Sequence, residues 1–152
     1  MRQFGMTILA PLARFSTNYA TVLLKDIQPA DFAKMPRGIK TNHPAFLYGH
    51  LAIYPERILE LVGQSDLAKP DPKFVELFAA GKECIDDPSR TIYPSMDEIV
   101  TRFQARHQAI LPILESASDE VFESANPNER MKDRFPTIGM AVNFLVSGHM
   151  MM

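Results

Sequence analysis

Hydrophobic residues at helical spacing constrain the fold of this chain more than any other feature. They recur every three or four positions in four segments, which span residues 10–26, 43–61, 96–114 and 136–152. No stretch shows the alternation of a β-strand or the turn residues of a hairpin. The pattern therefore predicts an all-α fold class, in which four amphipathic helices form a four-helix bundle with irregular, proline-rich connectors.

The composition indicates the size and class of the protein. A chain of 152 residues, 46% hydrophobic and 22% charged, is typical of one globular domain, so we expect a single domain over residues 1–152. The net charge is −2, and no basic block or basic amphipathic face predicts a nucleic-acid or membrane partner. Pro11 breaks the apolar run near the N-terminus and no stretch reaches membrane-spanning length, so we expect a cytoplasmic protein.

Prolines divide the segment between the second and third helices into short pieces. We expect a brief helix at residues 74–80, followed by a loop at residues 81–93. Cys84, the only cysteine, lies in this loop without a neighbouring motif that would activate it. A disulfide within the chain and a thiolate metal cluster are therefore excluded, and we expect Cys84 to be chemically inert.

A four-and-three spacing predicts the buried faces of the first and third helices. In the first helix the predicted face consists of Ile8, Leu12, Phe15, Tyr19 and Val22. A capping box formed by Ser95 and Glu98 marks the start of the third helix. Its predicted inward residues are Met96, Ile99, Phe103, Ile110 and Leu114, with His107 on the same side. Pro112 predicts a kink near Gln108 or an early helix end.

The second helix places a histidine among apolar residues. Asn42 can cap its N-terminus, Pro44 fits its first turn, and Gly63 is suited to end it. On a helical wheel His50 falls in the middle of an apolar stripe that contains Leu47, Leu51, Tyr54, Ile58 and Leu61. A histidine that faces a core needs partners for both ring nitrogens. One of those partners can be a metal ion.

The fourth helix carries a second histidine. It opens at Pro136 and Thr137, and its inward positions Ile138, Val142, Leu145 and His149 are separated by four, three and four residues. Met152 continues this stripe, and no residue typical of a helix end follows. We therefore expect the fourth helix to be truncated at Met152.

Three stretches resemble the DinB-like (DinB/YfiT) family of helical bundles. They are residues 42–51 (NHPAFLYGHL), residues 93–98 (YPSMDE), and residues 135–139 (FPTIG) leading to 147–149 (SGH). Phe46 departs from the family pattern, in which relatives often have Trp. Many members hold a divalent metal with one histidine of a Gly-His-Leu motif on the second helix and two ligands, four residues apart, on the fourth.

The resemblance implies a metal site at His50 and His149. The third ligand would lie one residue beyond Met152. The implied cofactor is a divalent transition metal (Zn, Ni, Fe or Mn), which suits imidazole ligands and leaves positions open for water or substrate. The implied function is that of a metal-dependent enzyme, a thiol-dependent S-transferase, isomerase or hydrolase. Its partners would be a low-molecular-weight thiol such as bacillithiol or mycothiol and a small-molecule substrate, with Tyr54 and His107 as pocket-wall candidates.

A second interpretation of the same residues stays open. His50 and His149 can be core histidines with hydrogen-bond partners, and the chain a metal-free structural or interaction module. Such a bundle would form a homodimer through an apolar patch that includes Phe4, Ile8 and the methionine-rich C-terminal segment. His107 is expected to be structural, and His43 a capping or surface residue.

Overall fold

The computed structural model describes residues 3–151, and the regular structure in this range is helical. One isolated antiparallel bridge, between Ala125 and Thr137, is the exception within these residues. The predicted all-α class is therefore confirmed. In chain order the helices are η1 (Gly5–Leu9, a π-helix), α1 (Ala10–Leu23), α2 (Pro44–Leu51), α3 (Tyr54–Leu61), η2 (Ser65–Leu67), α4 (Pro72–Phe78), α5 (Met96–Ser116), α6 (Asp119–Glu123), α7 (Ile138–Val146) and η3 (Gly148–Met150).

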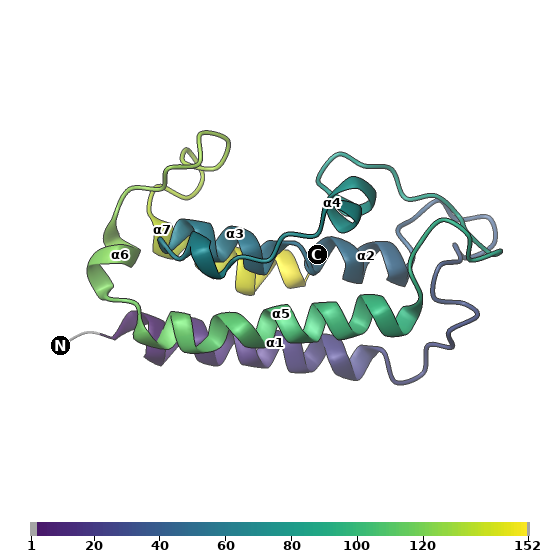
Figure 1. The fold of residues 1–152 in the computed structure, drawn as a ribbon, viewed down its shortest axis with the longest axis horizontal. Helices are drawn as coiled ribbons and strands as arrows, with labels where there is room; N and C mark the ends of the chain where they lie inside the picture. Colours follow the sequence, from purple (N-terminus) through teal and green to yellow (C-terminus); the bar gives the residue numbers. More distant parts are fainter. Residues whose placement is uncertain (1–2, 152) are drawn as a thin grey trace.

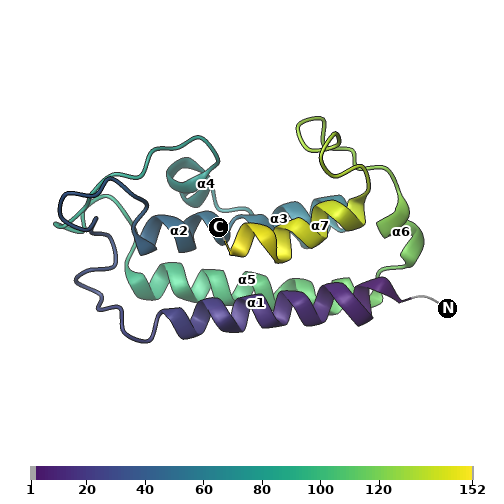
Figure 2. The same cartoon turned by 180° about the vertical axis from the view of Figure 1, so that it is seen from behind.

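The long helices form two layers. α1 and α5 lie side by side in one layer, and α2, α3 and α7 form the other (Figures 1 and 2). α2 and α3 follow one another end to end, α4 packs on the outer side of α2, and α6 leads from α5 to α7. None of the helices in the described range is long and apolar enough to cross a membrane. The core lies between the two layers.

The orientation predicted for α1 is wrong. Its buried residues are small: Ala10, Ala13, Ser16, Thr17 and Ala20. Of the predicted inward residues, Leu12 is half-buried, and Ile8, Phe15, Tyr19 and Val22 are exposed. Small side chains let the two backbones come close, and at Gly5 any side chain would collide with the carbonyl of Leu114 on α5. Both faces of this helix are apolar, so spacing alone did not indicate which one packs.

The segment expected to be one helix up to Leu61 is divided into α2 and α3. Pro55 has no N–H to donate to the carbonyl of Leu51, four residues earlier. The Nε2 of His107 on α5 donates to that carbonyl instead, at 3.1 Å. α3 then ends at Leu61, and Gly63 follows with a φ of +75°, so the predicted helix end is confirmed.

The first turns of α2 and α5 are only partly as predicted. His43, not Asn42, caps α2: its Nδ1 accepts a hydrogen bond from the N–H of Phe46 at 3.1 Å, and its side chain is buried. Ser95 caps α5 as predicted, accepting from the N–H of Glu98 at 3.2 Å. The early end predicted at Pro112 is wrong, because α5 continues to Ser116. Of the predicted inward residues of α5, Met96 is half-buried, and Ile99, Phe103, His107, Ile110 and Leu114 are buried.

The fourth predicted helix ends earlier than expected. Thr137 caps α7, and the helix stops at Val146 because Ser147 leaves helical conformation with φ −129° and ψ −81°. His149 therefore lies on the short turn η3 and not on α7, which corrects the prediction of one continuous helix. Met152 and the expected ligand position after it lie outside the described residues, as does the predicted truncation.

Candidate metal centre

His50 and His149 lie next to each other, although 98 residues separate them along the chain. His50 is in the last turn of α2 and His149 is on η3, and both are half-buried. Their Nε2 atoms are 3.3 Å apart. The fold thus brings together the two residues that the resemblance marked as metal ligands.

A hydrogen bond from the other ring nitrogen orients His50. Its Nδ1 donates to the carbonyl oxygen of Phe78 at 2.6 Å, at the end of α4. Because a carbonyl only accepts, Nδ1 carries the proton and the Nε2 lone pair points toward His149. Metal-binding histidines in proteins are usually held in this way, with the second ring nitrogen donating to a carbonyl or carboxylate.

Gly49 allows α4 to approach closely enough for this hydrogen bond. A Cβ atom built on Gly49 would lie 2.5 Å from atoms of the Phe78 ring. Any larger residue would therefore push the end of α4 away from α2, and the Phe78 carbonyl with it. The Gly-His pair at positions 49 and 50 is thus one structural unit, in which the glycine makes room for the carbonyl that orients the histidine.

Aromatic rings surround the pair. The ring centroid of Tyr54 is 4.9 Å from that of His50 and 4.2 Å from that of His149. Phe46 stacks parallel to His50, with centroids 6.3 Å apart and 7° between the planes. Burial raises the pKa of the Tyr54 hydroxyl, so Tyr54 is neutral near pH 7. These rings limit the access of water to the two imidazoles from the protein side.

The environment keeps His149 uncharged. Burial and, to a smaller extent, the neighbouring His50 lower its pKa from 6.5 to about 4. A neutral imidazole is the form that binds a metal. The Nδ1 of His149 is buried and has no hydrogen-bond partner among residues 3–151.

The separation of the two Nε2 atoms suits a shared metal ion. Two nitrogens bound tetrahedrally at about 2.0–2.1 Å from one zinc ion are about 3.3–3.4 Å apart. The same 3.3 Å also fits a hydrogen bond in which His149 donates from Nε2 to His50. Within residues 3–151 no group of three or more His, Cys, Asp or Glu side chains is placed to hold a metal. The described residues therefore include two of the three predicted ligand positions.

The other two histidines are engaged elsewhere. His107 is buried and donates to the carbonyl of Leu51, so it has the structural role that the sequence predicted. His43 caps α2 with one nitrogen and donates to the carbonyl of Ile85 with the other, at 2.9 Å. The capping prediction for His43 is confirmed, and the alternative that it lies on the surface is wrong.

Two cavities lie near the pair. A groove of about 690 Å³ between α1, α2 and η3 is lined by both His50 and His149. A second cavity, of about 650 Å³, is lined by Tyr54 and by charged residues that include Arg57, Glu60 and Arg130. His107 lines neither of them, whereas Tyr54 contacts the histidines from the side of the second cavity.

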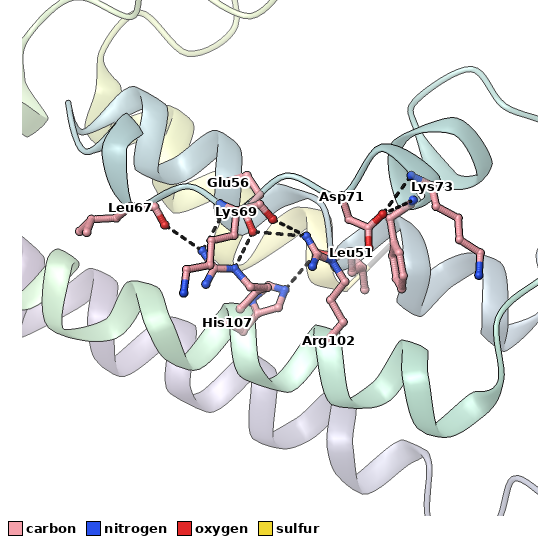
Figure 3. A network of polar contacts seen from close by, with 10 residues as sticks. Leu51, Glu56, Leu67, Lys69, Asp71, Lys73, Arg102 and His107 are labelled. Atoms are coloured by element: carbon pink, nitrogen blue, oxygen red, sulfur yellow. Dashed lines mark hydrogen bonds and ion pairs between the residues drawn. The ribbon is translucent and has the colours of Figure 1, made fainter.

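Sequence reasoning missed a buried ion pair between the two layers (Figure 3). Glu56 on α3 is 3% exposed, and its Oε1 accepts from the Nε of Arg106 at 2.6 Å. The second oxygen, Oε2, accepts from the Nη2 of Arg106 at 3.0 Å and from the backbone N–H of Lys69 at 2.7 Å. Arg102 donates to the carbonyl of Lys69 at 2.6 Å. This network ties the segment after α3 to α5. Its only sequence signal is two arginines one helical turn apart.

No protein-family model matches the chain, and no curated protein is significantly similar to it.

Proposed function

We propose that this chain is a metal-binding four-helix bundle of the DinB/YfiT type. Its four helices would be α1, α2 together with α3, α5, and α7. His50 and His149 would hold a divalent transition metal, namely Zn, Ni, Fe or Mn. The observation that carries this proposal is the 3.3 Å separation of the two Nε2 atoms, together with the hydrogen bond from Nδ1 to the Phe78 carbonyl that leaves Nε2 of His50 free of a proton.

The residues around the pair have separate roles in this proposal. The Phe78 carbonyl fixes the tautomer and the ring orientation of His50. Burial keeps His149 neutral, so no proton has to leave before it binds a metal near pH 7. The rings of Tyr54 and Phe46 exclude water from one side of the centre. When bound, such a metal acts as a Lewis acid that lowers the pKa of a thiol or of water.

The proposed reaction class is a metal-dependent transfer or hydrolysis. A low-molecular-weight thiol or water would be the nucleophile, and a small molecule would be the other substrate. This class is taken from the DinB-like resemblance. The groove that opens onto His50 and His149 supports it by giving a substrate a path to the pair.

Zinc affinity of single-site variants tests this proposal. We expect His50→Ala and His149→Ala each to weaken zinc binding at least about a hundredfold, measured by competition with a chromogenic chelator. His43→Asn is the matched control, because it also removes an imidazole but keeps a side chain that can cap α2. Equal zinc affinity in the wild type and in both alanine variants would contradict the proposal.

The exposed face of α1 supports a second candidate function, that of a module that forms homodimers. Phe15 is 60% exposed and Val22 is 64% exposed, and Ile8 and Tyr19 extend the same stripe. Such a repeat of apolar residues on a helix surface is typical of a helix that packs on another helix. Of the other residues predicted for the patch, Met151 is exposed, whereas Phe4 is half-buried and packs on Phe122 with centroids 5.9 Å apart.

Sedimentation velocity over a range of protein concentrations tests the homodimer. We expect Phe15→Glu to shift a dimer to a monomer, because it places a charge in the centre of the stripe. Gln64→Glu adds the same charge at an exposed position after α3, in the other layer, and should leave the dimer intact. A monomeric wild type at all concentrations would contradict this candidate function.

A further inference from the structure

We propose that the groove beside His50 and His149 is a substrate site for an uncharged, largely apolar molecule with one polar group. This inference deepens the proposed function and rests on it, because the groove is assigned to the substrate on account of the two histidines at its wall. It adds the chemical class of the substrate, which the motifs of the sequence do not indicate.

The size and the walls of the groove suit a small apolar molecule. Its volume of about 690 Å³ is within the range of about 300–1,000 Å³ that is typical of ligand sites. The apolar part of its wall comes from three elements of the fold. The apolar lining residues include Ala20 and Leu23 on α1, Leu47 and Leu51 on α2, Met150 on η3, and Met151 just after it. Methionine side chains adapt to ligands of different shape, as they do at other hydrophobic binding surfaces.

Apart from a metal held by His50 and His149, the groove offers no ion-pair partner for a charged ligand. Among the described residues that line it there is no Asp, Glu, Lys or Arg. The hydroxyl of Tyr48 is already used, since it donates to the carbonyl of Ala20. In the metal-free groove a charged molecule would lose hydration without gaining an ion pair, and that loss is costly. The cavity on the other side of Tyr54 differs, because Arg57, Glu60 and Arg130 line it.

The histidine pair is the site for the one polar group of the ligand. His50 and His149 both line the groove, and their imidazoles are its nitrogen-bearing side chains apart from Asn42. A hydroxyl, thiol or carbonyl at one end of the molecule can therefore reach the pair while the apolar remainder lies along α1 and α2. This orientation places the reacting end at the proposed metal and leaves the tail to determine affinity.

Binding of three molecules of equal chain length tests the inference. Octan-1-ol, octanoate and octylamine are titrated near pH 7 into the full chain, freed of metal with a chelator, and followed by isothermal titration calorimetry. We expect octan-1-ol to bind at least about tenfold more tightly than octanoate or the octylammonium ion, because octan-1-ol carries no charge that would lose its hydration in the groove. Octanoate or octylammonium binding as tightly as octan-1-ol would overturn the inference.

Two variants of α1 locate the binding site. Leu23 lines the groove and Phe15 does not, and both are exposed, so a charge at either position leaves the core unchanged. We expect Leu23→Glu to weaken octan-1-ol binding at least about tenfold and to favour octylammonium instead. Phe15→Glu should leave octan-1-ol binding within about twofold. Equal losses in the two variants would overturn the inference, because the general apolar surface of α1 would then be the binding site.

The metal content measured before treatment with the chelator separates this inference from the proposed function. If the protein holds no metal and still prefers octan-1-ol with the expected response to Leu23→Glu, the assignment of the groove stands and the metal proposal fails. If the protein holds a metal and octan-1-ol shows no preference, the ligand class is wrong and the metal proposal stands.

Discussion

His107 links the break between α2 and α3 to the stability of the whole protein, and its replacement gives a prediction with a defined pH dependence. The side chain is 2% exposed and donates to the Leu51 carbonyl that Pro55 leaves without a partner. In His107→Leu this carbonyl would be buried and unpaired, which costs about 1–3 kcal/mol of unfolding free energy near pH 7.5. His107→Gln keeps an N–H donor and should lose less than His107→Leu.

The cost of His107→Leu should disappear at lower pH. Burial lowers the pKa of His107 from 6.5 to about 4, despite its hydrogen bond to Leu51. Between these two values the unfolded chain binds a proton that the folded chain does not, so the wild type loses stability as the pH falls through this range. The loss attributable to His107 is about 2.5 kcal/mol near pH 4.5, at about 1.36 kcal/mol per pKa unit. Neither His107→Leu nor His107→Gln has the imidazole, so neither variant shows this pH-dependent loss of unfolding free energy.

Urea unfolding of the wild type and the two variants, followed by far-UV circular dichroism in the presence of a chelator, measures these differences. The stability curves of the wild type and His107→Leu should converge or cross between about pH 7.5 and about pH 4.5. A constant difference between them over this range would refute the reasoning, because it would show that His107 does not titrate differently in the folded and unfolded states.

Two further predictions concern close packing and the buried ion pair. Gly49→Ala should lower the unfolding free energy by about 1–3 kcal/mol and weaken zinc binding, because the new Cβ would lie 2.5 Å from the Phe78 ring and displace it. An unchanged urea midpoint together with an unchanged zinc affinity would contradict this prediction. Glu56→Gln should lower the unfolding free energy by about 3–5 kcal/mol, because it leaves the buried guanidinium of Arg106 without its carboxylate. The exposed control Glu60→Gln should lower it by only about 0–1 kcal/mol in the same urea titration.

The sequence predicted where the helices lie better than how they face. The inward side of α5 was predicted correctly because large apolar residues occupy one face of that helix only. α1 has large apolar residues such as Phe15 on one face and small ones such as Ala13 on the other. Close packing against α5 selects the small face, and spacing does not report how closely two helices approach.

The sequence also did not predict the role of a buried aspartate in the loop after α4. Asp87 is buried and accepts hydrogen bonds from the N–H groups of Thr91, Ile92 and Tyr93, which organises the loop after α4. Burial alone would raise the pKa of Asp87, but these hydrogen bonds hold it below its usual value. Nothing in the order of residues distinguishes this aspartate from the neighbouring Asp86, because its role follows from how the loop folds back.

For the candidate site, the sequence contributed the two histidines and the structure contributed their geometry. The motifs around His50 and His149 predicted a shared ligand role through the DinB-like resemblance. The sequence did not predict that His149 would lie on a short turn after α7, since the apolar pattern continues past Val146. It also did not predict the carbonyl of Phe78 as the partner of His50, which depends on the contact between α4 and Gly49.

The metal content of the purified protein tests the central proposal most directly. The protein should be prepared without a histidine tag and assayed by elemental analysis, both as purified and after it has been offered Zn, Ni and Mn. The proposal predicts close to one transition-metal ion per chain in at least one of these preparations, and its loss in His50→Ala. The absence of stoichiometric metal from all of them would contradict it, and His50 and His149 would then be a hydrogen-bonded pair within a metal-free helical protein.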